Sequence, residues 1–215
     1  MVVERMRKVR VSRSQSKRKS TLNIANSPQR LNVEVFPTGP FLAVPEVSSQ
    51  RREYIPIGWL EPPTIPSNKL RLMEGADLWH FAVLTSRMHM AWVRHIGGRL
   101  KSDYQYSVGL DYNAFPWPVA SAALQVRTRR LAQAVLDARA QFSGATLADL
   151  YDTDTMPVEL QRAHRALDAA IDRLYRPAVF NGDRERVEHL FGLYEKKTTP
   201  LPGILGGRPS KRRRG

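Results

Sequence analysis

Three polar side chains alternate along one short segment, and their chemistry suits the reading of DNA bases: Lys101, Asp103 and Gln105. Residues two apart on an extended backbone point to the same side. Lysine donates to guanine O6 and N7, aspartate accepts from cytosine N4, and a glutamine amide suits adenine. A surface ion pair between Lys101 and Asp103 explains the same spacing, and by spacing alone it is the favoured interpretation.

The residues that could hold a metal ion are spaced in ways that favour structural roles. His89 and His95 lie six residues apart, whereas two ligands on one helix face lie three or four apart. Asp149, Asp152 and Asp154 form an acidic cluster, but the neighbouring threonines favour a capped loop that enters a helix. We therefore predict no metal site, and we expect the helix histidines on half-buried faces.

Motifs for nucleotide binding and nucleophilic catalysis are missing from these 215 residues. There is no G-x-G-x-x-G after a predicted strand, no G-x-x-x-x-G-K-S/T phosphate loop and no G-x-S-x-G elbow. The absence of cysteine excludes disulfides, thiol catalysis and cysteine-held metals. The residues alone build no convincing active site.

The net charge of +14 lies at the two ends of the chain. Residues 1–30 carry nine Lys or Arg and only Glu4, and residues 197–215 carry six basic residues and no acid. The stretches 31–121 and 122–196 are each neutral. Basic ends bind polyanions by counterion release, or they serve as solvated tails. Charge alone leaves both interpretations open.

Length and hydropathy indicate a soluble chain with a buried core. The sequence is 42% hydrophobic, which argues against a wholly disordered chain. No apolar run approaches the roughly 20 residues of a membrane helix, and residues 1–10 lack the apolar core of a signal peptide. We expect a cytoplasmic protein with no membrane partner.

The first half of the chain has the pattern of β structure followed by one long helix. Strands are predicted at apolar runs between polar and proline-rich turns, residues 31–36, 41–44, 54–59 and 70–73. Pro45 and Pro56 place two of these strands at edges or bulges. A helix is predicted over 77–97, capped by Asp77, and residues 99–118 read as an aromatic loop.

The second half has the pattern of a small helical domain. Helices are predicted over about 122–141, after Ala145-Thr146, over about 157–175 and from Asn181-Gly182-Asp183. The remaining residues are rich in Pro, Gly and Arg, and we expect them to be disordered.

Five longer strings occur in the same order as in one known family: RREYIPIGWL (51–60), HFAVLTSRMHMAWVRHIGGRLKSDYQYS (80–107), YNAFPWP (112–118), LADLYDTDTMPVELQRAHRALDAAIDRLYR (147–176) and RVEHLFGLYEK (186–196). The first three resemble the target-recognition domain of the MmeI-like DNA methyltransferases, the type IIL restriction-modification enzymes. The last two resemble that family's C-terminal helical domain.

The resemblance implies that the segment after the glycine-ended helix reads bases. It favours base reading over the surface ion pair for the Lys-x-Asp spacing. The implied DNA-binding residues are Lys101, Asp103, Gln105, Ser49, Arg51 and Arg52. The aromatic residues Tyr112, Phe115 and Trp117 could stack on bases, but packing between the two domains is the favoured interpretation.

The family's full enzymes resemble adenine-N6 methyltransferases that use S-adenosylmethionine. Their Asn-Pro-Pro-Tyr type motif, their cofactor loop and a nuclease motif are all missing here. We therefore expect no catalytic residue and no cofactor in this chain. S-adenosylmethionine is expected on a methyltransferase catalytic domain or subunit that acts in trans.

Together these patterns predict an α+β protein with a mixed or antiparallel β recognition domain and a long helix, followed by a small all-α domain. The expected boundaries are 1–118, 119–196 and a basic tail at 197–215. The expected function is sequence-specific binding of double-stranded DNA, as the specificity portion of a restriction-modification methyltransferase. A non-functional gene remnant and a basic RNA-binding protein are the alternatives.

Overall fold

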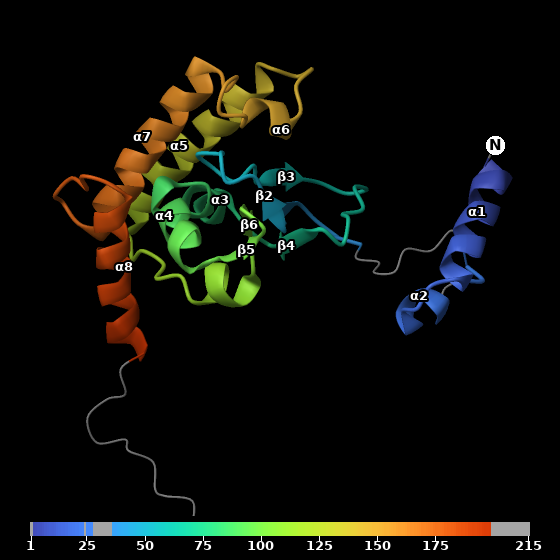
Figure 1. Cartoon of the computed structure of the whole chain (residues 1–215). Helices are drawn as coiled ribbons and strands as arrows, with labels where there is room; N and C mark the ends of the chain where they lie inside the picture. The colour runs from blue at the N-terminus through green and yellow to red at the C-terminus, as the bar shows by residue number, and fades with distance from the viewer. Residues whose placement is uncertain (1, 24, 28–35, 199–215) are drawn as a thin grey trace, which may run out of the picture. The chain divides into compact units, whose positions relative to one another are not determined.

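The computed structural model describes residues 2–23, 25–27 and 36–198 (Figure 1). These residues belong to two units, one made of residues 1–46 and 57–76 and the other of residues 47–56 and 77–215. The strand predicted at 31–36 and the tail expected at 197–215 fall largely outside the described residues.

The first unit contains two N-terminal helices and a three-stranded antiparallel sheet. Its elements are α1 (Val2–Ser14), α2 (Lys19–Asn23), β1 (Phe41–Pro45), β3 (Gly58–Leu60) and β4 (Leu70–Glu74), with strand order β3-β1-β4. Strand β1 is central and buried from Phe41 to Val44.

The prediction that Pro45 marks an edge or bulged strand is wrong, because β1 is paired on both sides and its register with β4 is unbroken from Phe41 to Pro45. Pairing with β3 ends at Ala43, so the missing N–H of Pro45 interrupts no hydrogen bond on that side. The apolar run at 54–59 is only partly a strand. Tyr54, Ile55 and Ile57 are buried without belonging to one.

Two helices in the second unit replace the single long helix predicted over 77–97. Helix α3 spans Leu78–Leu84 and α4 spans Arg87–Ile96. Ser86 separates the two helices. Its backbone is extended, and its hydroxyl caps α4 by accepting from the His89 N–H at 3.3 Å. The Asp77 cap is confirmed: its carboxylate accepts from the backbone of α3, and the His80 ring completes a capping box.

The segment predicted as an aromatic loop contains a hairpin and a helical turn. Strands β5 (Gly98–Leu100) and β6 (Asp103–Gln105) pair antiparallel, and β2 (Val47–Ser48) joins the other side of β6. A π-helix, Val108–Asn113, follows. Strands of two or three residues are too short to show alternation of polar and apolar residues. They are therefore recognised by their pairing across the sheet and not by the local sequence pattern.

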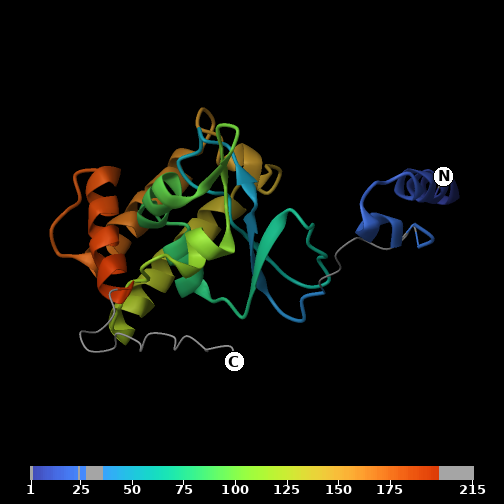
Figure 2. The same cartoon turned by 60° about the horizontal axis from the view of Figure 1, so that its bottom comes forward.

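The four C-terminal helices lie where the sequence predicts them. They are α5 (Ala122–Ala140), α6 (Leu147–Leu150), α7 (Val158–Tyr175) and α8 (Asp183–Thr198). Helices α5 and α7 lie side by side, and α8 packs against α4 (Figures 1 and 2). The apolar stripe of α7 is buried at Leu160, Leu167 and Ile171. Lys197 and Thr198 are helical, although the sequence assigned them to the tail.

None of the helices in the described part of the chain is long and apolar enough to cross a membrane. The mixed α and β composition, the antiparallel sheets and the helical C-terminal region agree with the predicted fold class.

Candidate DNA interface

The small sheet β2-β6-β5 brings together two candidate segments that lie 50 residues apart in the sequence. Val47 pairs with Gln105 and Ser48 with Tyr104, so the turn after β2 lies beside the start of β6. The backbone N–H of Gln50 donates to Asp103 Oδ1 at 3.2 Å. We call residues 49–52 the β2 turn and residues 101–102 the hairpin loop.

The extended geometry assumed for Lys101 and Asp103 is wrong, because Lys101 lies in the hairpin loop and Asp103 begins β6. Leu100 pairs with Asp103, which leaves Lys101 and Ser102 as a two-residue loop. Lys101 has a φ of 58° and is the single non-glycine residue with positive φ in the described part of the chain. A positive φ at the first loop position is typical of a type II′ turn, where glycine is the usual residue.

Asp103 has a structural role that its sequence position did not reveal. One carboxylate oxygen accepts the Gln50 N–H, which ties the β2 turn to the hairpin. A carboxylate has further acceptor sites, so this bond leaves capacity for a base. Gln105 lies two residues along the same strand and therefore shares a strand face with Asp103. Both side chains are half-buried.

The β2 turn is held by its own polar groups, by helix α6 and by the loop before α7. The Ser49 hydroxyl accepts from the Arg51 N–H at 3.3 Å. Arg51 pairs with Asp154 at 2.7 Å, with both side chains about two-thirds exposed (64% and 67%). Arg52 donates to the Ala148 carbonyl at 3.4 Å. An exposed ion pair contributes little, so Arg51 can exchange Asp154 for a phosphate at small cost.

Two residues near these turns were missed by the sequence analysis. The Arg99 guanidinium lies 4.2 Å from the centre of the Tyr104 ring and also donates to the carbonyls of Arg94 and Ser102. Gln50 is exposed at the centre of the β2 turn. Its position between Ser49 and Arg51 was the available signal.

Two histidines are fully buried, contrary to the expectation of half-buried faces. His89 contacts the Tyr106 hydroxyl at 3.1 Å, and His164 contacts the Tyr151 hydroxyl at 2.6 Å. Burial lowers the pKa of each imidazole to about 3, and for His164 the nearby Arg139 adds to this effect. Both rings are therefore neutral parts of the core.

The acidic cluster is used for local structure. Asp149 forms a capping box with Thr146 at the start of α6, Asp152 accepts from the Asp154 N–H, and Asp154 pairs with Arg51. Helix α7 itself has no side-chain cap, because Pro157 occupies that position. Within residues 2–23, 25–27 and 36–198, no group of three metal-ligating side chains comes together.

The aromatic residues at 112–117 pack inside the second unit. The Phe115 ring is buried and lies 4.7 Å from His89 and 6.2 Å from Trp92, centre to centre. Trp117 contacts Tyr112 at 5.3 Å. These rings all belong to residues 80–118, so they support a packing role for Phe115 but not the predicted packing between the two domains.

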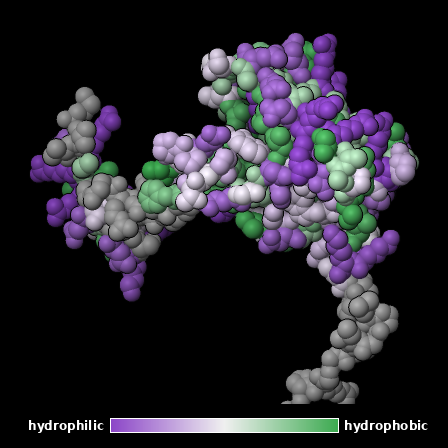
Figure 3. All heavy atoms as spheres, turned by 180° about the vertical axis from the view of Figure 1, so that it is seen from behind, coloured by the Kyte–Doolittle hydropathy of each residue, from purple (hydrophilic) through white to green (hydrophobic). Residues whose placement is uncertain are grey.

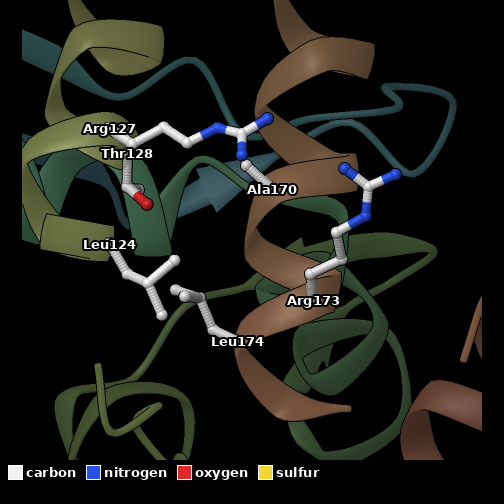
Figure 4. Close-up of a pocket in the computed structure, with 6 residues that line it drawn as sticks. All are labelled: Leu124, Arg127, Thr128, Ala170, Arg173 and Leu174. Atoms are coloured by element: carbon white, nitrogen blue, oxygen red, sulfur yellow. The ribbon is translucent and has the colours of Figure 1, made fainter. Parts of the chain in front are cut away.

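A depression between α5 and α7 is the hollow drawn in Figure 4. Leu124 and Leu174 point toward each other there, and Arg127 and Arg173 extend at its side. Its volume of about 40 Å³ is far below the roughly 300 Å³ at which small-molecule sites begin. It is a packing gap rather than a ligand site.

Two family models match nearly the whole chain. The model described as MmeI, target recognition domain, matches residues 1–119, and the one described as MmeI, C-terminal domain, matches residues 121–202. DNA methyltransferase A of Bacillus subtilis (strain 168) is 39% identical over 198 residues, which is 92% of this chain and 22% of that protein.

A solved structure, of the Type IIL restriction-modification enzyme MmeI in complex with DNA, is similar with a TM-score of 0.83 and 38% identity. The similarity covers 93% of this chain and 27% of that one. The architecture is therefore that of a target-recognition module with its helical companion domain. The chain belongs to the MmeI family and spans about a quarter of the length of these relatives.

Proposed function

We propose that this chain is the sequence-specific, double-stranded-DNA-binding portion of an adenine-N6 methyltransferase of the restriction-modification type. The observation that carries the proposal is the match of both family domains, together with the similarity to MmeI in complex with DNA. Methyl transfer requires S-adenosylmethionine and a catalytic domain with the motifs missing from these residues. We propose that this domain is the chain's functional partner, in cis or in trans.

In the proposed mechanism the hairpin loop and the start of β6 read a G·C pair. Lys101 supplies donors for guanine O6 and N7, and the free acceptor capacity of Asp103 suits cytosine N4. The backbone of Lys101 supports this role, because a lysine at a positive φ costs stability that glycine would not. The presence of a lysine at this strained position is explained if its ammonium group is needed. Gln105 reads the next base, and Ser49, Arg51 and Arg52 contact phosphates or bases.

The experiment that tests the proposal is selection of duplexes from a random DNA library by the purified chain at about 150 mM salt, where phosphate binding alone is weakened. An enriched motif that contains a fixed G·C pair supports sequence-specific recognition. Salt-sensitive binding with no motif contradicts it. Tight binding of RNA with no preferred duplex would favour a basic RNA-binding protein instead.

The first prediction concerns the two base-reading side chains. Lys101→Gly is expected to leave the melting temperature unchanged or higher, because glycine accepts the positive φ, while preference for the G·C pair falls about tenfold or more. Asp103→Asn keeps an oxygen for the Gln50 N–H but replaces the other carboxylate oxygen by an N–H donor. The preference of the chain for the same base pair should therefore fall. Competition binding with the selected duplex and its single-base variants measures both.

The control for this pair is Lys69→Gly, which removes an exposed lysine outside both turns. It should leave the preference intact. Unchanged discrimination at every position in both Lys101→Gly and Asp103→Asn would refute the assigned reading residues.

A second prediction concerns α1, which exposes Arg5, Arg7, Lys8 and Arg10. Hydrophilic residues are purple in Figure 3. Replacing Arg5, Arg7, Lys8 and Arg10 by Gln is expected to weaken binding to all duplexes by the same factor. Each lost phosphate contact reduces the magnitude of the negative slope of log K against log salt by about 0.9, so four substitutions reduce it by at most about 3.6. Arg13 is left in place because it donates to the Ser27 carbonyl at 3.0 Å. Salt titration with selected and scrambled duplexes measures the slope, and a changed motif would contradict the prediction.

A further inference from the structure

A continuous set of hydrogen bonds connects the first residue of α8 to the β2 turn. Asp183 accepts from Arg94 Nη1 at 2.5 Å and from Arg87 Nε at 2.9 Å. Arg94 Nη2 donates to the Glu53 carbonyl at 3.0 Å, directly after the β2 turn. Burial opposes the ionisation of Asp183, but Arg87 and Arg94 outweigh this effect and lower its pKa. The Asp183 carboxylate is therefore charged at neutral pH.

Tyr104 joins this set to both candidate segments. Its ring is 5% exposed, and its hydroxyl donates to the Gln50 carbonyl at 3.1 Å and accepts from Arg94 Nε at 3.4 Å. The same Gln50 donates its N–H to Asp103. The backbone N–H and the backbone carbonyl of Gln50 are therefore both bonded to side chains of β6, the first to Asp103 and the second to Tyr104.

We propose that Tyr104 and Arg94 are positioning residues for recognition, which hold the β2 turn in register with the hairpin loop through Asp183 of α8. This inference rests on the proposed function and adds residues that touch no base. Base discrimination depends on placing donors and acceptors within fractions of an ångström, so a loosened turn loses specificity before it loses phosphate contacts. In this arrangement the C-terminal helix α8 contributes to the choice of sequence.

The chain offers a closely matched pair of variants. Tyr104→Phe removes the hydroxyl that bonds Gln50, whereas Tyr106→Phe removes a hydroxyl on another buried ring that contacts only His89 among the hydrogen bonds described. Both changes delete one oxygen from a buried ring. Tyr106→Phe should lower the melting temperature without moving the preference for the selected duplex. Tyr104→Phe should reduce that preference about tenfold at unchanged affinity for scrambled DNA.

Amide hydrogen exchange supplies a readout that does not depend on DNA. The Gln50 N–H should exchange several-fold faster in Tyr104→Phe and at the wild-type rate in Tyr106→Phe. Arg94→Lys keeps the charge but cannot span Asp183, Glu53 and Tyr104 together, so it should behave like Tyr104→Phe.

The outcomes separate this inference from the proposed function. A wild-type chain with no preferred duplex overturns the proposed function, and the inference with it, before any variant is compared. A wild-type preference that survives Tyr104→Phe, or that falls equally in Tyr106→Phe, overturns the positioning role alone. Faster Gln50 exchange together with a selective loss of preference supports it.

Discussion

Gly97→Ala is expected to destabilise the fold by about 3 kcal/mol, whereas Gly98→Ala is expected to cost less than about 1 kcal/mol. A Cβ on Gly97 would lie 2.5 Å from Asp111 Oδ1 and 2.6 Å from the Val93 carbonyl oxygen. The nearest atom to a Cβ on Gly98 is the Gln105 carbonyl oxygen at 3.5 Å, an ordinary contact. The adjacent glycines thus form a matched pair.

The reason for glycine at position 97 is close approach rather than backbone freedom. Its φ is −63°, which any residue adopts, although a helix-ending glycine usually takes a left-handed conformation. Asp111 is buried, and its Oδ2 accepts from the Ser107 N–H at 2.6 Å, so the carboxylate cannot move aside without losing that bond. The Val93 oxygen belongs to the backbone of α4 and cannot yield either.

Urea unfolding of the wild type and the two variants at pH 7 measures these costs. Equal stabilities for Gly97→Ala and Gly98→Ala would show that Asp111 does not occupy the space beside Gly97. Asp111→Ala in the Gly97→Ala background should recover part of the loss, since one of the two close contacts disappears.

Stability is expected to fall by about 2 to 3 kcal/mol between pH 7 and pH 5. His89 and His164 have folded pKa values of about 3, against about 6.5 in an unfolded chain. Below pH 6.5 the unfolded state therefore binds more protons, and each histidine costs about 2 kcal/mol by pH 5.

Asp168 acts in the opposite direction within the same range. Burial raises its pKa to about 6, outweighing the hydrogen bonds from Tyr54 and the Arg87 N–H. As the pH falls, the folded state binds this proton before the unfolded state does. This adds about 1 kcal/mol to the free energy of unfolding by pH 5. The net loss is consequently smaller than the two histidines alone would give.

Unfolding free energies at pH 7, 6 and 5 test this balance. His89→Gln lowers stability at pH 7 but should remove about 2 kcal/mol of the pH-dependent loss. His95→Gln is the control for removing an imidazole from the same helix. A flat profile in the wild-type chain would contradict the assignment of two buried neutral histidines.

The helices of the second half could be predicted from the sequence because each carries its own start signal. Thr146 with Asp149, Pro157 and the Asn181-Gly182 turn all act over three or four residues, which a linear pattern contains. The family resemblance also followed from the sequence, because long collinear strings are specific without any geometry. The matches to both family domains confirm it.

The local pattern failed in two places, one where a second local signal overrides it and one where distant pairing sets the backbone. The apolar stripe across 77–97 continues through Ser86, so periodicity predicts one helix, whereas the Ser86 cap divides it in two. The conformation of Lys101 is set by the pairing of β5 with β6, and a lysine in a polar segment gives no hint of a positive φ.

The candidate interface depends on the same distinction. Residue types made Lys101, Asp103 and Gln105 candidates, because donors and acceptors are properties of side chains, and the family resemblance then favoured them for base reading. Their relation to the β2 turn comes from strand pairing between residues more than 50 positions apart. Sheet pairing and long-range hydrogen bonds such as that of Tyr104 with Gln50 exist only once the chain has closed these long loops, so only folding brings the groups together.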